Sequence, residues 1–545
     1  MCNVPVGLGA KRTLTVWSRP MFTALWSPPA KDFESTTAGT LASRWYTGWP
    51  GTGMRKPHQT KAQAATPYID ALLEYRAKGM VAFHTPGHKL GKGAPPIMRE
   101  AFGDTLLGVD VAMAGGVEDT RESTSLVAAA EALAAAAWGG ERCFFLVNGS
   151  TSGIHSLLLA LAGPGDGVIL PRNAHKSVQA ALIFSGAVPH YVEPEIDPIW
   201  GIPLNVPAER VAAAVEAHPH AKAVFVVSPS SNGVCAALEA IAGVVHDGGL
   251  PFVVDQAWGP HLRFCSALPL DAMSAGADAM VASTHKLISG ITQSSVLVAR
   301  GERLSLQRLE SIVKMTQSTS PQVLIYASID AARAQMALYG EQLWSQAVEN
   351  AEWARARLGQ IAGVRVMGAE VLARRGVADF DRTRLTVSAC DLGLNGYELE
   401  TALRDHYGIA VEAADPLNVL LNVTYGDSRD DVACFTTAMA DLAARRRDAG
   451  AVSCDTLLAS WPRFSRQVMS PRDAFFAASE AIPVKHAAGR VSAEMVAPYP
   501  PGIPIVAPGE EVSDELVAYL TEASARAMHV HGPEDLTLKT LRVVS

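Results

Sequence analysis

The stretch ADAMVASTHKLISGITQSSVLVAR, residues 277–300, decides the fold prediction. Its apolar start predicts a short buried strand, which ends in a polar turn carrying Ser283, His285 and Lys286. Because the small residues Ser289-Gly290 follow, we expect the lysine to lie against the protein body. A desolvated lysine has a lowered pKa and is nucleophilic towards carbonyl carbon. A single lysine at a strand end more often reaches solvent, so this interpretation depends on the features that surround it.

A second apolar run, Leu250 to Trp258 (LPFVVDQAW), contains Asp255, which lies 31 residues before Lys286. In a parallel α/β sheet, ligands bind outside the carboxyl ends of the strands, so both side chains should face one crevice. An aspartate there can keep a pyridine nitrogen protonated, as the electron sink of pyridoxal phosphate requires, and Lys286 would hold the aldehyde of that cofactor. Ala257 is small enough to let the ring lie close. Taken alone, the aspartate could equally cap the next helix or turn.

A phosphate-binding turn is predicted upstream of both residues. The apolar strand Cys143 to Val147 runs into a turn rich in Gly and Ser, which opens an apolar helix. Backbone N–H groups at such a helix start, with the hydroxyls of Ser150 and Thr151, form an anion site. Ser283 and His285 can approach the same phosphate from the lysine turn. Any helix N-cap looks similar, so the weight comes from the order of phosphate turn, aspartate and lysine.

This order resembles that of fold type I pyridoxal phosphate enzymes. The sequences of six segments are similar to those of the ornithine/lysine/arginine decarboxylase family. The similarity runs from about residue 67 to about residue 511. The segments are FHTPGHKLGKG (83–93), FFLVNGSTSGI (144–154), PRNAHKS (171–177), STHKLISGITQSS (283–295), QSTSP (317–321) and PYPPGIPIVAPGE (498–510).

The resemblance implies an α/β fold with an aspartate aminotransferase-like large domain. That domain should hold a mostly parallel sheet, followed by a smaller α/β domain and a C-terminal decarboxylase-type domain. We place the cofactor-binding large domain at residues 67–370, the small domain at 371–455 and the C-terminal domain at 456–545.

Residues 1–66 differ from the rest of the chain. They hold eight Lys and Arg against two acidic residues, and they show neither helical nor strand periodicity. We interpret them as an unpacked extension, or as the result of a start codon assigned too far upstream, with Met54 as the natural alternative. A targeting leader is less favoured because no amphipathic stripe is visible.

The resemblance also implies roles for residues that show no clear signal by themselves. His175 would stack on the cofactor ring and orient the substrate carboxylate, although a lone histidine is more often an ordinary helix-start residue. Ser318 and Thr319 would complete the phosphate site of a neighbouring subunit, or simply cap the next helix. Glu494 or Glu510 would meet a cationic substrate tail, where a solvated surface charge is the plainer interpretation.

The chain departs from the family pattern at several positions. Trp258 stands where many short members carry His, and Ser231 and Asn232 stand where tyrosines are common, which weakens any transfer of substrate preference. Ala174 replaces a usual Cys, a change that we expect to be harmless. Residues 116–121 (GVEDTR) depart from the usual wording at their last two positions, so their role is less certain.

Composition narrows the class of protein. A chain of 545 residues, 48% hydrophobic and 18% charged, is long enough for two or three domains with a large buried core. The sequence contains no apolar run of 18 or more residues, so we do not expect a membrane span. The net charge of −8 argues against a nucleic-acid surface. The seven cysteines are scattered and form no CxxC, which favours a reducing cytoplasm and gives no metal-site spacing.

The sequence therefore predicts a pyridoxal phosphate-dependent decarboxylase of a basic amino acid. Lys286 would hold the cofactor, Asp255 would keep its ring protonated, and Lys286 or His175 would return a proton to the α-carbon. We expect a homodimer or higher homo-oligomer with shared active sites. Arginine is slightly favoured over lysine or ornithine, because short members of the family are often arginine decarboxylases.

Two alternatives stay open at this stage. An aminotransferase or a β-eliminating lyase of the same fold type shares the phosphate turn, the aspartate and the lysine. It would need an arginine to clamp the substrate carboxylate, and Arg384 is a weakly placed candidate. A non-enzymatic, cofactor-binding regulator is disfavoured, because every chemical position is filled and no DNA-binding segment is visible.

Overall fold

The computed structural model describes residues 61–112, 125–446, 461–499, 502–526 and 528–545. The predictions for residues 1–60, including a start at Met54, and for residues 116–121 lie outside these ranges. Within the predicted extension, packing starts before residue 67, because the buried Arg333 donates hydrogen bonds to the carbonyl oxygens of Gln63 and Ala65.

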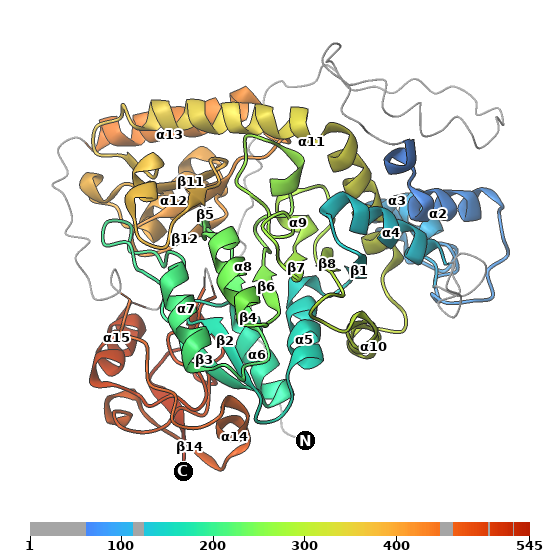
Figure 1. The fold of residues 1–545 in the computed structure, drawn as a ribbon. Helices are drawn as coiled ribbons and strands as arrows, with labels where there is room; N and C mark the ends of the chain where they lie inside the picture. Colours follow the sequence, from blue (N-terminus) through green and yellow to red (C-terminus); the bar gives the residue numbers. More distant parts are fainter. Residues whose placement is uncertain (1–60, 113–124, 447–460, 500–501, 527) are drawn as a thin grey trace, which may run out of the picture. The chain divides into compact units, whose positions relative to one another are not determined.

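A seven-stranded sheet with the order β1-β8-β7-β6-β4-β2-β3 lies at the centre of the large domain (Figure 1). Strand β8 is antiparallel to both of its neighbours, β1 and β7, whereas β6 pairs in parallel with β7 and with β4. The carboxyl ends of β1, β6 and β7 therefore lie at one edge, which confirms the predicted, mostly parallel sheet. The strands are β1 (Arg142–Leu146), β2 (Gly167–Pro171), β3 (Val188–Val192), β4 (Val224–Val227), β6 (Phe252–Asp255), β7 (Ala279–Ala282) and β8 (Ser295–Ala299).

Helices cover both faces of this sheet, which explains why its strands are continuous apolar runs. Cys143 and Phe145 face one hydrophobic cluster, and Phe144 and Leu146 face the other. The first cluster is built with α2 (Pro67–Ala77), α4 (Leu126–Trp138), α7 (Ala208–Ala217), α8 (Leu238–Asp247) and α11 (Val323–Leu358). The second is built with α5 (Gly149–Leu161), α6 (Lys176–Ser185) and α10 (Leu306–Thr316).

A smaller α/β part follows α11, whose last turns pack into its core through residues such as Leu358. Its four-stranded sheet has the order β12-β13-β11-β9, and every pair in it is antiparallel. Helix α13 runs beside α11 (Figure 1). The elements are β9 (Arg365–Val366), β11 (Arg384–Ser388), α12 (Gly396–Tyr407), β12 (Ala413–Ala414), β13 (Val419–Asn422) and α13 (Arg429–Arg445).

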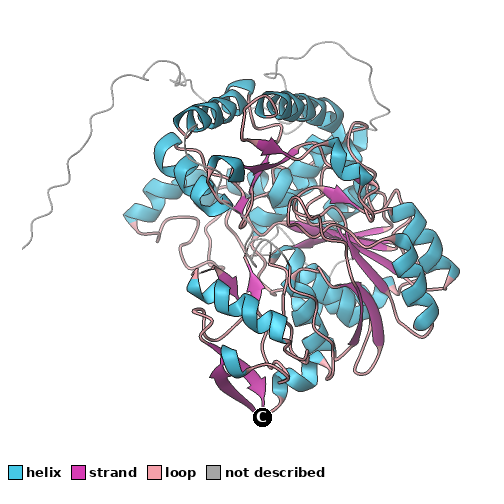
Figure 2. Ribbon diagram, turned by 90° about the vertical axis from the view of Figure 1, so that its left-hand side faces the viewer, coloured by secondary structure: helices cyan, strands magenta, loops and turns pink. Residues whose placement is uncertain are grey.

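The C-terminal part has a hydrophobic cluster of its own, formed around α15 and two two-stranded sheets. Figure 2 shows the pair that ends at the C-terminus. The elements are α14 (Pro471–Phe476), β14 (Ser479–Pro483), η6 (Val484–His486), β15 (Ala497–Pro498), α15 (Asp514–Ala525), β16 (Val530–His531) and β17 (Thr540–Val544). The exact domain boundaries near residues 370 and 455 stay predictions.

Short elements complete the described fold. They are η1 (Lys61–Ala64), α3 (Pro96–Val109), β5 (Val234–Cys235), η2 (Leu262–Phe264), η3 (Ala369–Ala373), β10 (Asp379–Phe380) and η4 (Cys390–Leu392). A search of the described residues for a helix long and apolar enough to cross a membrane found none.

Candidate active site

Lys286 lies in α9 (Thr284–Leu287), the single helical turn that follows β7. Its Nζ is 3.8 Å from the ring centroid of Trp258. Burial lowers the pKa of Lys286 to about 8; Asp255 opposes this shift and Arg384 adds to it. A substantial fraction of this amine is therefore neutral near physiological pH, as attack on a carbonyl group requires.

Asp255 is the last residue of β6 and is 7% exposed. Its Oδ1 accepts a hydrogen bond of 3.0 Å from the backbone N–H of Ala257. Burial raises the pKa of Asp255, while the charge of Lys286 and the N–H of Ala257 act in the opposite direction. A cationic partner at the free oxygen would stabilise the carboxylate further.

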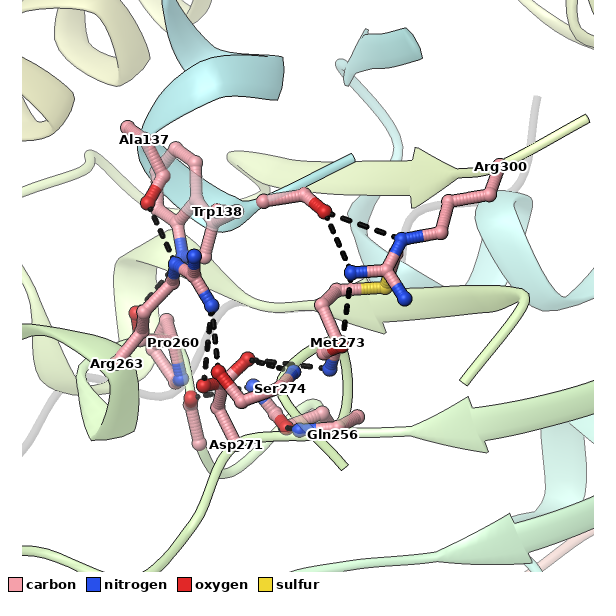
Figure 3. Close-up of polar contacts among 12 residues, drawn as sticks. Ala137, Trp138, Gln256, Pro260, Arg263, Asp271, Met273, Ser274 and Arg300 are labelled. Atoms are coloured by element: carbon pink, nitrogen blue, oxygen red, sulfur yellow. Dashed lines mark hydrogen bonds and ion pairs between the residues drawn. The ribbon is translucent and has the colours of Figure 1, made fainter. Parts of the chain in front are cut away.

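The segment that follows Asp255 is held by side chains from several directions (Figure 3). Gln256 donates to the carbonyl of Gly259 at 2.8 Å, and Trp138 donates to the carbonyl of Pro260 at 3.0 Å. These bonds fix the backbone that directly follows Trp258. Further contacts of the same kind join Ala272 N to Gln256, Arg263 to Ala137 and Ser274, and Arg300 to Gly139 and Met273.

The predicted phosphate turn opens α5. Its N-cap, Asn148, makes no side-chain capping bond, so this helix start is open to an anion. Ser150 and Thr151 lie in the first turn and are half-buried. The N–H of Gly149 donates to the carbonyl of Gln293 at 2.8 Å, which places this turn beside the segment that follows the lysine turn.

Ser283 and His285 come from the lysine turn itself. The hydroxyl of Ser283 is buried and has no hydrogen-bond partner among the described residues. A buried hydroxyl in this state needs an external partner, and a phosphate oxygen fits. His285 is oriented by a bond of 2.7 Å from its Nδ1 to the carbonyl of Ser294, the residue after Gln293.

His175 is the N-cap residue of α6, and its Nδ1 accepts a hydrogen bond from the N–H of Ser177 at 3.2 Å. Burial, followed by the charge of Lys286, lowers the pKa of His175 to about 3, so the ring is neutral. Gly502 packs against it: a Cβ at that position would lie 3.4 Å from Nε2 of the histidine. The C-terminal part thus contacts the predicted ring-stacking residue.

A cavity of about 600 Å³ brings the three parts of the fold together. The large domain contributes His175, Trp258, His285 and Lys286 to its wall, whereas the buried Asp255 is not among the lining residues. Sequence reasoning missed the acidic side of the cavity. The small part contributes Tyr397, Glu400, Glu412 and Asp415, and the C-terminal part contributes Trp461, Tyr499, Tyr519, Met528 and His529.

The two glutamates predicted to meet a substrate tail have other partners. Both carboxylate oxygens of Glu510 bind Arg172 at 2.8 Å, deep inside the protein. Glu494 is also buried and accepts backbone hydrogen bonds from Glu534 and Arg542. Neither glutamate lines the cavity. Each carboxylate instead binds groups of the protein itself.

This arrangement predicts a structural effect for Glu510→Gln. Removing one partner of a buried ion pair leaves the Arg172 guanidinium without its counter-charge, which costs about 3–5 kcal/mol. We expect the free energy of unfolding to fall by this amount. Urea denaturation, monitored by hydrogen exchange in residues 461–545, measures it. Glu511→Gln is the matched control, because its exposed ion pair with Arg466 contributes less than about 1 kcal/mol. Equal losses in the two variants would contradict the prediction.

Other predicted positions are also placed by the structure. Asn232 and Trp258 line the cavity together with Ser231. Arg384 is buried, and its guanidinium donates to the carbonyl of Ser231 and lies 4.5 Å from the ring of Trp258. Thr319 is exposed in this single chain, in the connection between α10 and α11.

Comparison with known protein families gives the deciding observation. The family "Orn/Lys/Arg decarboxylase, major domain" matches residues 66–431, and "Orn/Lys/Arg decarboxylase, C-terminal domain" matches residues 456–535. The chain belongs to the Orn/Lys/Arg decarboxylase family. Its fold is therefore that of fold type I pyridoxal phosphate enzymes, and it is a pyridoxal phosphate-dependent decarboxylase. The family assignment gives no support to the aminotransferase or lyase alternative.

Relatives with known names agree with this membership. An arginine decarboxylase of Bacillus subtilis is 39% identical over 485 residues, which is 89% of this chain and 98% of that protein. An arginine decarboxylase of Halalkalibacterium halodurans is 38% identical over 482 residues, 88% of this chain and 98% of that protein. Among solved structures, lysine decarboxylase A from Pseudomonas aeruginosa has a TM-score of 0.74 at 23% identity, with 88% of this chain and 80% of that chain covered. The last similarity concerns the fold alone.

The residues of this decarboxylase fit the cofactor of its family. Lys286 supplies a buried amine with a lowered pKa, and Asp255 supplies a buried carboxyl group at the neighbouring strand end. Ser283 supplies a buried hydroxyl without a protein partner, and the first turn of α5 supplies free N–H groups. We therefore keep Ser150, Thr151, His175, Ala257 and His285 as proposed cofactor contacts.

Proposed function

We propose that this decarboxylase acts on arginine and releases its α-carboxylate as CO2. The observation that carries the proposal is the cavity, which holds the amine of Lys286 together with the carboxylates of Glu400 and Glu412. A basic amino acid has an α-amino group that can react with the cofactor and a cationic tail that needs a negative counter-charge. The lining residues of this cavity can serve both groups. The named relatives of similar length, which are arginine decarboxylases, support the choice of arginine.

When bound, pyridoxal phosphate supplies an aldehyde for the amino group and a ring that accepts the electron pair of the broken bond. Lys286 would hold the cofactor through its aldehyde, and the same amine, in its protonated form, would return a proton to the α-carbon of the substrate. The lowered pKa of Lys286, about 8, suits such a transfer. His175 is neutral and a much weaker acid, so we assign it to packing and orientation. The negative charge of Asp255 would favour a proton on the ring nitrogen of the bound cofactor.

The pKa of Lys286 sets a pH dependence. Above about pH 8 the amine is mostly unprotonated and reactive, and below that value the unprotonated fraction falls tenfold per pH unit. The rate at which the cofactor-free protein attaches pyridoxal phosphate should therefore rise with pH and level off above about 8. Stopped-flow absorbance from pH 6 to 9.5 measures this rate. A profile centred near 10.5, the ordinary lysine value, would contradict the assigned environment.

We propose that the enzyme is a homodimer or higher homo-oligomer in which Ser318 and Thr319 complete the phosphate site of the neighbouring subunit. The exposure of Thr319 in the single chain is compatible with this role. Light scattering of the purified protein tests the assembly. Thr319→Ala, assayed for cofactor affinity, tests the shared site.

We also propose a cytoplasmic enzyme of polyamine biosynthesis. Four described cysteines, at positions 143, 235, 265 and 434, are free thiols, which supports a reducing compartment, whereas the disulfide of Cys390 counts against it. Cell fractionation decides the compartment, and a drop in polyamine content after deletion of the gene decides the pathway.

The substrate is tested with purified protein, pyridoxal phosphate and carboxyl-labelled arginine, lysine or ornithine. Labelled CO2 and an equal amount of amine should form fastest with arginine. Formation of a keto acid without CO2 would overturn the decarboxylase proposal. Faster release from lysine or ornithine would overturn the choice of arginine.

A further inference from the structure

The acidic side of the cavity contains three carboxylates that differ in how they are already used. Asp415 accepts hydrogen bonds from the backbone N–H groups of Leu417 and Asn418, each at 2.8 Å, and from the Asn418 side chain at 3.0 Å. Glu412 is exposed and accepts a bond of 2.8 Å from Asn422. Both carboxylates therefore have protein partners.

Glu400 is different. It lies within α12, lines the cavity and is only half-exposed. No hydrogen bond or ion pair joins its side chain to any residue that the structure describes. A half-buried carboxylate that faces a cavity without a counter-charge is suited to bind a cation.

Two tyrosines that line the same cavity as this carboxylate give an independent sign of a polar ligand. Tyr519 is 7% exposed and lines the same cavity, yet its hydroxyl has no hydrogen-bond partner within the described ranges. Tyr397 lies on the same side of α12 as Glu400, three residues earlier, and its hydroxyl is equally free of described partners. A phenol as buried as that of Tyr519 normally finds a partner, whereas Tyr397 is only half-buried. Tyr519 and Glu400 thus line one cavity, and neither side chain has a partner among the described residues.

Arginine provides the groups that these side chains lack. Its guanidinium is planar, carries five N–H donors and can bind a carboxylate with two parallel hydrogen bonds. It also stacks favourably on aromatic rings such as that of Tyr519. A neutral urea group in the same place would keep the shape and lose the charge.

We propose that Glu400 binds the guanidinium of the substrate, with the hydroxyls of Tyr397 and Tyr519 beside it, and so determines the preference for arginine. This inference rests on the proposed function. It assigns the recognition of the substrate tail to helix α12 rather than to Glu494 or Glu510 in the C-terminal part.

The test compares arginine with citrulline, its uncharged analogue, in the cofactor-loaded full-length enzyme. In Glu400→Gln we expect kcat/KM for arginine to fall roughly 30- to 1,000-fold, mainly through KM, because a desolvated charge pair is lost. The inhibition constant of citrulline should stay near the wild-type value. Glu400→Asp, which keeps the charge, should recover part of the loss. Asp405→Asn is the matched control, because it removes an exposed charge from the same helix.

Several outcomes would overturn the assignment. One is a folded Glu400→Gln enzyme that keeps the wild-type ratio of arginine KM to citrulline inhibition constant. Another is a larger shift of that ratio in Glu412→Gln. If Glu400→Gln does not fold, Glu400→Asp and Tyr519→Phe take its place, and an unchanged arginine KM in both rejects the proposal. Failure of the wild-type enzyme to release CO2 from any basic amino acid would instead reject the proposed function itself.

Discussion

Lys286→Ala is expected to abolish decarboxylation and to remove the visible absorbance that marks covalently held pyridoxal phosphate. The reason is local: this amine lies in the cavity wall with a pKa lowered to about 8 by burial. We propose this amine both as the nucleophile that holds the cofactor aldehyde and as the proton donor. Loss of a residue with two such roles should lower kcat by at least roughly 10⁴-fold, comparable to removing the nucleophile of other covalent catalysts.

Two further variants separate reactivity from charge. Lys286→Arg keeps a cation beside Trp258 and Asp255 but offers no nucleophilic amine, so it should be as inactive as the alanine variant. Lys314→Ala removes an exposed lysine from α10 and should behave as the wild type. Borohydride reduction followed by peptide mass analysis locates the attached cofactor. A modified lysine other than residue 286 would reject the assignment.

The core of the large domain could be predicted from the sequence because its strands are buried on both faces. The runs that end at Val147, Asp255 and Ala282 are apolar without alternation, and the structure pairs them as neighbours or near neighbours in one sheet. A strand-end position also fixes which edge a following residue faces. The sequence alone therefore predicts that the lysine, the aspartate and the phosphate turn lie at one edge of the sheet.

The acidic side of the cavity could not be found in this way. Glu400 lies in GYELETALRDHY, an amphipathic helix in which a glutamate looks like any solvated charge. Only the packing of α12 and α15 around one cavity turns it towards a ligand. Tyr519, which lines the same cavity, lies more than 100 residues further along the chain, and no local pattern predicts that the two residues share a cavity.

Glu510 shows the converse difficulty. Its place in the proline-rich segment PYPPGIPIVAPGE drew attention to it, but its partner Arg172 is 338 residues away in sequence. In a sequence, a carboxylate that pairs with a buried arginine cannot be distinguished from one that binds a cationic substrate. Burial separates them, since Glu510 is fully enclosed and Glu400 opens into the cavity.

Asp255→Asn should slow turnover by roughly 100- to 1,000-fold while leaving the cofactor bound. Asparagine has the same shape and can still accept the N–H of Ala257, so the segment before Trp258 should keep its conformation. It carries no negative charge, however, and cannot keep a proton on the ring nitrogen. A decrease in turnover of this size is typical when a preorganised charge that stabilises the transition state is removed.

The measurement is kcat at saturating arginine and cofactor, with absorbance spectra recorded on the same samples. Asp255→Glu restores the charge at a displaced position and should recover part of the rate. Asp247→Asn, an exposed residue at the end of α8, is the control for an unrelated loss of charge. If Asp255→Asn turned over at a near-normal rate, the ring would not need this carboxylate. If it lost both activity and cofactor, Asp255 would act mainly in binding, and the electron-sink role would have to be given up.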